Sequence, residues 1–248
     1  MLQSSILWNQ PPADLALSSD DVHVWRASLD ESPSKVQQLA QILSPDEQAR
    51  AARFYFEQHR KRFIVARGLL RTILSYYLKI QPIAIDFTYS KYGKPELATA
   101  SNIGKLEFNV SHSQDLALYA VTRDRQIGID LEQIRPVADA QQIVERFFSE
   151  QEKIAFQSLP AEQKQAAFFN AWTRKEAYLK ACGDGLNRPL NQVEVSMTPG
   201  ESATLIKVEG SLAAANHWCL QALTPAPDYA AAMVVEGHDW QLNCWQYF

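Results

Sequence analysis

The feature that most constrains the fold of this chain is a faint repeat in which matching residues lie 105 positions apart. Residues 44–48 (SPDEQ) and 149–153 (SEQEK) both begin predicted helices, and the first has a capping-box pattern with proline at the first helical position. Helix openings also resemble one another by chance. The repeat nevertheless predicts two similar halves that meet at a cleft, which is a common place for a ligand. Further matching pairs are Phe63 and Phe168, Ile64 and Phe169, and Ala66 and Ala171.

The order of predicted elements fits this arrangement, because helices and strands each occur in both parts of the chain. The sequence therefore predicts an α+β fold with an N-terminal half over residues 1–121 and a C-terminal half over residues 122–248. The predicted elements are a strand over 22–27, helices over 44–57 and 59–78, strands over 83–89, 106–110, 117–121 and 127–131, helices over 138–182, and strands from 193 onward.

Composition and charge exclude several classes of protein. Of the 248 residues, 46% are hydrophobic and 21% are charged, as in an ordinary soluble protein with a core of normal size. Cys182, Cys219 and Cys244 are too widely spaced, and odd in number, for a disulfide framework or a metal site, which favours a reducing compartment. Residues 1–6 show no leader, and no run reaches the roughly 18 apolar residues of a membrane span. We expect a cytoplasmic protein that does not associate with a membrane.

The net charge of −4 conceals a basic stretch between residues 50 and 94, which holds ten lysines and arginines but only two acidic residues. The simpler interpretation is a solvated helix face. The alternatives are a site for a small polyanion, or an RNA-binding surface that uses the aromatic residues 54–56. The acidic net charge and the lack of a nucleic-acid-binding motif argue against RNA, so we expect no nucleic-acid partner.

The motif IGIDLE at residues 127–132 ends a predicted strand. Since side chains alternate along a strand, Asp130 and Glu132 face the same side. Two such carboxylates repel each other unless solvent or a cation lies between them. Magnesium suits the pair, because it prefers oxygen ligands and combines carboxylates with phosphate oxygens. Taken alone, the motif is better explained by a solvated strand end.

A second motif, WTRKEAYLK at residues 172–180, lies in a predicted helix. Trp172, Glu176 and Lys180 are spaced by four residues and therefore share one helix face. By itself this is an exposed Glu–Lys pair. Together with the first motif, it offers a third carboxylate to a metal ion and an ammonium group to phosphates.

A third motif, NVSHS at residues 109–113, closes another predicted strand. A lone histidine is more often a hydrogen-bonded structural residue than a catalyst. Here His112 is flanked by Ser111 and Ser113 at a junction between strand and turn, where donors could meet a phosphate group.

The order and spacing of these motifs resemble the Sfp-type 4′-phosphopantetheinyl transferases, a cytoplasmic, monomeric class built of two similar α+β halves with the active site between them. That family's signature is (I/V)-G-(I/V)-D-x-E, followed after about 40 residues by W-(S/T/C)-x-K-E-(S/A)-x-x-K, and both parts are present here. Three more motifs match in register, and the resemblance covers roughly residues 44–190. These motifs are YGKP at 92–95, FNVSHS at 108–113, and RFFS at 146–149 followed by Glu152.

The resemblance implies a set of ligand-binding residues. Asp130, Glu132 and Glu176 would bind magnesium, or manganese, at the pyrophosphate of coenzyme A. Arg62 would hold the 3′-phosphate, and the basic stretch thereby gains a small polyanionic ligand. The remaining implied contacts to coenzyme A are Lys94, Ser111, His112 and Lys180, with Lys175 expected at the same wall of the site.

The implied reaction transfers phosphopantetheine from coenzyme A to a serine of an apo acyl or peptidyl carrier protein, and adenosine 3′,5′-bisphosphate leaves. Catalysis of such a transfer consists mainly of positioning and charge neutralisation, with His112 and Lys180 as participants. Glu152 matches the glutamate usually proposed as the base, and a water on the metal is the competing candidate. We expect Glu152→Gln to lower turnover while leaving coenzyme A binding intact.

The sequence departs from the family pattern at one place and leaves other points open. Glu47 stands where some relatives carry lysine, so neither Glu47 nor the nearby Arg50 and Arg53 is assigned to the site. Phe147 and Phe148 belong either to a dock for the carrier or to the core. A non-catalytic coenzyme A binder is the rival hypothesis, but such a protein would be expected to lose a metal carboxylate or Lys180. A chain twice the size of the short trimeric synthases favours one cleft within a monomer.

Overall fold

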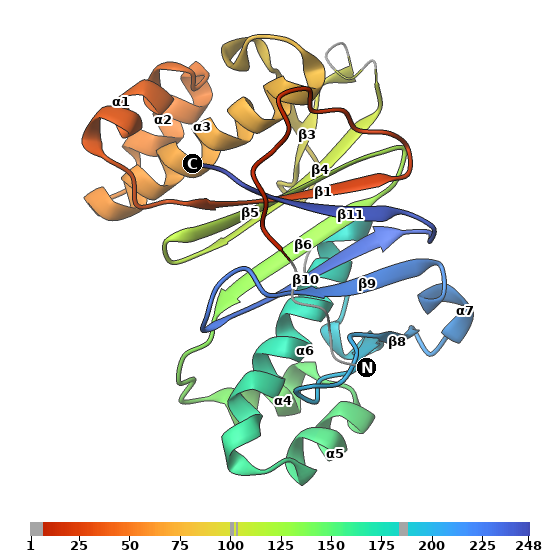
Figure 1. Ribbon diagram of the computed structural model, residues 1–248. Coiled ribbons are helices and arrows are strands. Elements are labelled where there is room, and N and C mark those ends of the chain that lie inside the picture. The colour runs from red at the N-terminus through yellow and green to blue at the C-terminus, as the bar shows by residue number, and fades with distance from the viewer. Residues whose placement is uncertain (1–6, 100–101, 103, 184–187) are drawn as a thin grey trace.

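The structure is a computed structural model that describes residues 7–99, 102, 104–183 and 188–248. Residues 1–6, for which we expected no leader, lie outside the described residues. Two sheets form the middle of the molecule, one with the strand order β11-β1-β5-β4 and the other with the order β6-β10-β9. Helices α1, α2 and α3 cover the outer face of the first sheet, and α4, α5 and α6 cover that of the second (Figure 1).

The first sheet combines strands from both ends of the chain. β1 (Asp21–Ser28) pairs antiparallel with β5 (Leu116–Arg123), which pairs antiparallel with β4 (Leu106–Ser113). On its other side, β1 pairs in parallel with β11 (Gln241–Gln246). The predicted division into residues 1–121 and 122–248 stays a prediction, but the last strand belongs to the sheet of the N-terminal half.

Helix α3 (Glu57–Leu78) forms the core of the first half. Its apolar residues recur at three- and four-residue spacings and are buried, as the pattern predicts. They pack against residues on the outer, helix-covered face of the first sheet, including Trp25 and Tyr119. Two short helices, α1 (Pro33–Gln41) and α2 (Pro45–Ala52), precede α3. The 3-10 turn η1 (Pro82–Ala84) and the ribbon of β2 (Phe87–Tyr89) and β3 (Pro95–Leu97) follow it.

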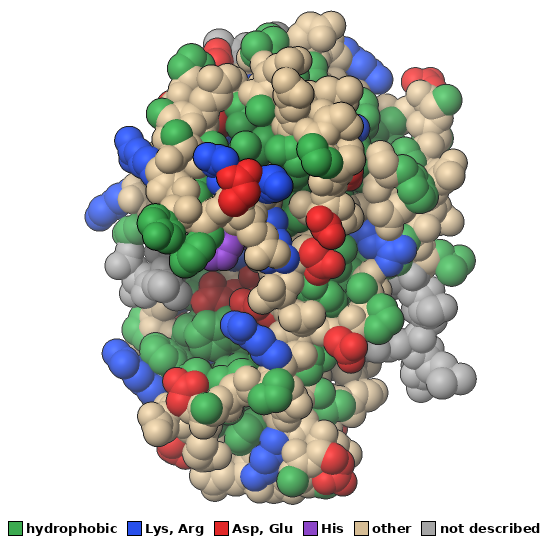
Figure 2. Space-filling view, turned by 90° about the vertical axis from the view of Figure 1, so that its left-hand side faces the viewer, with side chains coloured by type: hydrophobic (Ala, Val, Ile, Leu, Met, Phe, Trp, Pro, Cys, Tyr) green, Lys and Arg blue, Asp and Glu red, His purple; other side chains and the backbone are tan. Residues whose placement is uncertain are grey.

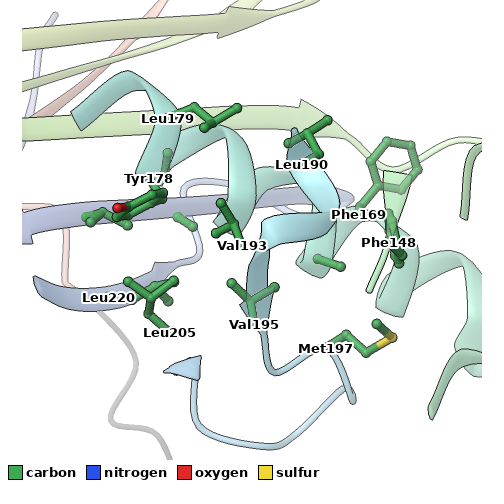
Figure 3. Packing of buried hydrophobic residues seen from close by; sticks show 14 of the residues in the cluster. Phe148, Phe169, Tyr178, Leu179, Leu190, Val193, Val195, Met197, Leu205 and Leu220 are labelled. Atoms are coloured by element: carbon green, nitrogen blue, oxygen red, sulfur yellow. The ribbon is translucent and has the colours of Figure 1, made fainter. Parts of the chain in front are cut away.

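The second half is built in a similar way around helix α6 (Ala161–Cys182), which packs on β6 and β10. Its apolar side chains meet those of the other elements in the core shown in Figure 3. The predicted helical region is divided into three helices. The elements of this half are β6 (Ile127–Gln133), α4 (Ala140–Phe147), α5 (Glu150–Ser158), α6, η4 (Leu190–Gln192), β7 (Val193–Val195), β8 (Leu205–Val208), α7 (Leu212–Ala215), β9 (Trp218–Leu223) and β10 (Tyr229–Glu236).

The two sheets share a third apolar cluster, in which Val22, Val24 and Leu118 of the first sheet meet Ile129 and Met233 of the second. Burial on both faces explains why β5 is almost continuously apolar rather than alternating, whereas β1 also buries the polar His23. The layers therefore run helix, sheet, sheet, helix. Within the described ranges, no helix combines the length and the apolar character that crossing a membrane requires.

A glycine sets the distance between α6 and β6. A Cβ atom added to Gly128 would lie 2.1 Å from the carbonyl oxygen of Ala177 and 2.3 Å from the backbone nitrogen of Ala181. Real Cβ atoms do not approach backbone atoms so closely. The glycine of the IGIDLE motif is thus required because the helix lies directly on the strand at this point.

Candidate active site

Two carboxylates of β6 lie between the sheets and are held by β4. Asp130 is 5% exposed and its Oδ1 accepts hydrogen bonds from Ser111 Oγ at 2.9 Å and from Lys180 Nζ at 2.6 Å. Glu132 is half-buried, and its Oε2 accepts from Ser113 Oγ at 2.9 Å. The second carboxylate oxygen of Asp130, Oδ2, is buried and has no hydrogen-bond partner among the described residues. An unpartnered buried carboxylate oxygen is costly, so this atom marks a place for a ligand.

Helix α6 adds Glu176 and Lys180, which face the strand one helical turn apart. Lys180 Nζ also donates to Ser111 Oγ at 3.1 Å and to the carbonyl oxygen of Ile129 at 3.3 Å. Burial raises the pKa of Glu176, and the negative charge of Asp130 adds to the shift. The three predicted metal-binding carboxylates are therefore brought together, and their mutual repulsion would be relieved by a cation.

The donor set fits a hard divalent cation in chemical type, since it consists of three carboxylates, one of which has an unpartnered buried oxygen. Their atoms are not already gathered around one point. No group of three potential metal ligands in the described part of the chain has the geometry of a formed metal site. Asp130 Oδ1 is instead paired with the ammonium group of Lys180.

The N-terminal half forms the opposite wall with His112, Lys94 and Arg62. The side chain of His112 is exposed, yet partial desolvation and then the positive charges of Lys180 and Arg62 lower its pKa. Lys94 Nζ donates to the carbonyl oxygens of Lys180, at 2.8 Å, and Ile127, at 3.4 Å, which joins the two halves. Figure 2 shows acidic side chains in a hollow on this face, with basic side chains and a histidine around its upper rim.

A cavity of about 250 Å³ next to Lys180 is lined by both halves, with Tyr92, Lys94 and Asn109 on one side and Leu179 on the other. A larger cavity of about 560 Å³ lies in the first half, where Asp46, Arg50, Arg53, Phe54 and Tyr89 line it. The larger cavity contains none of the predicted site residues. The smaller one has two of the predicted site residues in its lining, Lys94 and Lys180, but none of the three carboxylates.

Glu152 and Lys175 are placed away from this cluster, in the core of the second half. Lys175 is fully buried, and its Nζ lies 2.6 Å from Glu152 Oε2 and 3.0 Å from the carbonyl oxygen of Leu190. The Glu152 carboxylate is 3% exposed and also accepts from the backbone nitrogens of Ser149 at 2.7 Å and Val195 at 2.9 Å. Lys175 therefore does not lie at the coenzyme A wall that the sequence predicted for it.

Comparison with known proteins agrees with this geometry. Residues 126–234 match the model of the 4′-phosphopantetheinyl transferase superfamily, and residues 25–124 match the model of a 4′-phosphopantetheinyl transferase N-terminal region. The 4′-phosphopantetheinyl transferase HetI of Nostoc sp. is 47% identical over 247 residues, which cover 100% of both chains. The chain belongs to the 4′-phosphopantetheinyl transferases.

More distant relatives carry the same name. A putative 4′-phosphopantetheinyl transferase of Synechocystis sp. is 35% identical over 72% of this chain and 71% of its own length. The 4′-phosphopantetheinyl transferase Sfp of Bacillus subtilis is 27% identical over 67% of this chain and 71% of its own. The predicted resemblance and the α+β class of this transferase are confirmed.

In this transferase, Glu47 is a counterpart of Glu152 that sequence reasoning left without a role. It is 2% exposed and accepts from Arg71 Nε at 2.6 Å, from Arg67 Nε and from the Ser44 backbone nitrogen at 3.0 Å. Both glutamates occupy the third position of a capping box and pair with a cation of the long helix that follows. The signal was present in the sequence as an acidic capping-box residue 20 to 24 positions before a helical cation.

Sequence reasoning also missed the part played by Asn109 and Ser113 of this transferase. Their side chains accept hydrogen bonds from the backbone nitrogens of Ile129 and Gln133, at 2.9 and 3.1 Å. The available signal was the alternation of polar residues at positions 109, 111 and 113, which puts all three on one face of β4. Phe148 is 1% exposed and belongs to the core, whereas Phe147 is only partly buried.

Proposed function

We propose that this transferase moves the 4′-phosphopantetheine group of coenzyme A to a serine of an apo acyl or peptidyl carrier protein, releasing adenosine 3′,5′-bisphosphate. The observation that carries the proposal is the convergence of Asp130, Glu132, Glu176 and Lys180 beside an unpartnered buried carboxylate oxygen. Carboxylates and a cation together suit a phosphoryl transfer, in which charge neutralisation and positioning supply most of the catalysis.

We assign the cation site to Asp130, Glu132 and Glu176, with Mg²⁺ as the expected ion and Mn²⁺ as the alternative. The donor types and the raised pKa of Glu176 support this assignment. A divalent ion bound there would neutralise charge on the pyrophosphate oxygens of coenzyme A. For this to happen, Lys180 would exchange its contact with Asp130 for a contact with a phosphate oxygen.

The N-terminal wall would bind the rest of coenzyme A. Arg62 and Lys180 are the cations that can donate to phosphate oxygens, and His112 adds a neutral donor. Ser111 would donate to a phosphate only by giving up its hydrogen bond to Asp130. The lowered pKa of His112 keeps its ring neutral at pH 7, so it would contribute a hydrogen bond rather than a charge. Lys94 already donates to two carbonyl oxygens, and we assign it to the shape of the wall and to the field near the ligand.

The carrier serine must lose a proton, and the two candidates to accept it are Glu152 and a water that the proposed cation site would hold. The three hydrogen bonds and the burial of Glu152 support a role through Lys175 over a role as the base. Lys175 directly precedes Glu176, so an anchored Lys175 also fixes the start of the helical turn that carries the metal carboxylate. The predicted loss of turnover in Glu152→Gln is compatible with either role, which is why a paired variant is needed to separate them.

The proposed partner is a single carrier domain, and we propose that the transferase acts as a monomer in the cytoplasm. Support for a monomer comes from the site itself, since its two walls are supplied by β4 and by β6 with α6 of one chain. A protein with an acidic net charge of −4 is also a poor general binder of nucleic acid or of anionic lipid.

Intact-mass spectrometry of an apo carrier protein tests the proposal. The carrier is incubated with the transferase, coenzyme A and Mg²⁺, and a parallel sample contains EDTA. We expect the carrier to gain the mass of one phosphopantetheine group only when the metal is present. No gain with several carrier types, despite tight coenzyme A binding, would favour the non-catalytic coenzyme A binder.

A further inference from the structure

A row of side chains joins the two sheets of this molecule along β4 and β6. Three polar residues of β4 accept hydrogen bonds from three backbone nitrogens of β6, and the partners are 20 residues apart each time. The bonds run from Ile129 N to Asn109 Oδ1 at 2.9 Å, from Leu131 N to Ser111 Oγ at 3.2 Å, and from Gln133 N to Ser113 Oγ at 3.1 Å.

These side-chain hydrogen bonds take the place of the backbone hydrogen bonds that would join two paired strands. β4 is the outer strand of the four-stranded sheet, β6 is the outer strand of the three-stranded sheet, and the two strands are not paired with each other in either described sheet. The backbone nitrogens of an unpaired edge need acceptors when they are buried. Side-chain oxygens of β4 supply these acceptors, so the position of β6 relative to the first sheet depends on them.

The two serines of the row have a second contact. Each hydroxyl has one hydrogen to donate, and Ser111 donates it to Asp130 whereas Ser113 donates it to Glu132. In both cases the same hydroxyl also accepts a hydrogen bond from a backbone nitrogen of β6. The carboxylate belongs to the residue that directly precedes that nitrogen in the chain. Asn109 occupies the equivalent place opposite Gly128, which has no side chain. The same arrangement is thus made twice, once for each carboxylate of β6.

Ser113 is the member of the row whose role can be isolated. Ser111 also accepts from Lys180 and is itself a proposed coenzyme A contact. Among the described residues, the Ser113 hydroxyl bonds only to β6, where it contacts Glu132 and the backbone nitrogen of Gln133. The positively charged neighbours of Glu132 include Arg135 and Lys180. Without the Ser113 hydroxyl, the long Glu132 side chain would be free to turn toward Arg135.

We propose that Ser113 is a positioning residue that orients Glu132 toward the divalent cation and ties that orientation to β4. The inference rests on the proposed function, because the cation is part of it. Hydrogen-bonding partners of metal ligands fix the direction in which the ligand oxygen points, and their loss weakens metal binding about tenfold or more.

The test compares Ser113→Ala with Ser113→Thr, which keeps the hydroxyl. Mn²⁺ binding is titrated by electron paramagnetic resonance with coenzyme A present and carrier absent, so that no turnover occurs. We expect Ser113→Ala to weaken Mn²⁺ affinity by about tenfold, and Ser113→Thr to remain within about twofold of the wild type. Coenzyme A affinity in EDTA should be the same in all three proteins, and the Gln133 amide should exchange faster in Ser113→Ala.

A matched control removes a hydroxyl of the first sheet that lies outside the site. Thr122 Oγ1 donates to the carbonyl oxygen of Asp21 at 3.0 Å, and Thr122→Val should lower the melting temperature without changing Mn²⁺ affinity. Wild-type Mn²⁺ affinity in Ser113→Ala, with or without a lower melting temperature, would overturn the positioning role alone. Absence of Mn²⁺ binding in the wild type would instead overturn the metal in the proposed function, and the positioning role with it.

Discussion

The buried and half-buried glutamates of this transferase differ in their contacts, and this difference supports the opposite roles proposed for them. Glu132 and Glu176 lie half-buried with few donors, so burial raises the pKa of each, and a cation is the partner they lack. Glu47 and Glu152 are more deeply buried, yet cations and backbone nitrogens occupy their oxygens. At the scale of single residues, hydrogen-bond occupancy thus distinguishes the two carboxylates proposed to bind a cation from the two that are already paired.

A paired substitution separates an anchor from a base at Glu152. Glu152→Gln leaves the buried Lys175 ammonium without its counter-charge, and we expect a loss of about 3–5 kcal/mol in the free energy of unfolding. Glu152→Gln combined with Lys175→Met removes both charges and should recover most of that stability, as measured by urea unfolding. If Glu152 acts as an anchor, turnover should return with stability. A stable double variant with wild-type Mn²⁺ affinity, whose turnover stays more than about a hundredfold below wild type, would identify Glu152 as the base.

His23 gives the transferase a pH-dependent stability that is independent of the site. It is 3% exposed, and burial lowers its pKa to about 4. Trp25 Nε1 donates to the Tyr77 hydroxyl at 2.7 Å, which leaves that hydroxyl to donate to His23 Nδ1 at 2.9 Å and so favours the neutral ring. Because the unfolded chain binds a proton near pH 6.5 and the folded chain does not, stability is full above that pH and falls between pH 6.5 and 4, by about 3 kcal/mol.

Urea unfolding at several pH values between 7 and 4 measures this effect, with His23→Gln as the reference because it lacks the titrating ring. We expect the wild type to lose more stability than the variant as the pH falls. Parallel pH profiles for the two proteins would show that His23 does not titrate in this way.

At the scale of secondary-structure elements, α6 connects the core of the second half with the candidate site. One side of the helix carries Lys175 into the core, and another carries Glu176 and Lys180 to β6. The distance between helix and strand is set at Gly128, where the backbones of β6 and α6 meet. The spacing of the site therefore depends on a residue that has no side chain.

Gly128→Ala tests this dependence. The new methyl group would collide with backbone atoms of Ala177 and Ala181, which cannot turn aside as a side chain can, so α6 must move from β6. We expect a loss of about 1–3 kcal/mol in stability, together with Mn²⁺ binding at least tenfold weaker than wild type, a magnitude taken from the loss of metal-ligand support. Ile129→Val in the same strand should cost about 1 kcal/mol and leave Mn²⁺ binding unchanged. Equal Mn²⁺ affinities for both variants would show that metal binding does not depend on the distance between α6 and β6.

At the scale of the whole molecule, the last strand of the chain, β11, makes the contact on which the first sheet depends. β11 pairs in parallel with β1 and places Cys244, 5% exposed, in the cluster between the two sheets. A half consisting of residues 1–121 alone would lack this strand and expose an edge of β1. The two halves are thus similar in pattern but are not independent of each other.

Removal of residues 241–248 measures how far the halves depend on β11. The deletion exposes the edge of β1 and takes apolar contacts of β11 from the shared core. We expect a loss of roughly 4 kcal/mol, about 10 °C in melting temperature for a protein of this size, and stronger aggregation through the free edge. Circular dichroism melting and light scattering would record both. An unchanged melting temperature would mean that β11 is an addition to a sheet already stable without it.

The sequence by itself determined the local features of this transferase. The capping boxes at Ser44 and Ser149, the long amphipathic helices and the shared face of Asp130 and Glu132 follow from spacings of two to four residues. The motifs also predicted the family and the cluster that unites β6 with α6. Such patterns can be predicted because backbone geometry fixes which nearby residues share a face.

Only the tertiary structure decided what each polar group touches. The burial of Lys175 with Glu152, the row from Asn109 to Ser113, and the pairing of β11 with β1 all join residues between about 20 and 220 positions apart. For a side chain that can point either to solvent or to the core, the neighbouring residues in the sequence do not determine the direction. Its choice depends on whether a distant segment supplies a partner for its charge or hydrogen bonds, because a buried polar group without a partner costs more than burial gains.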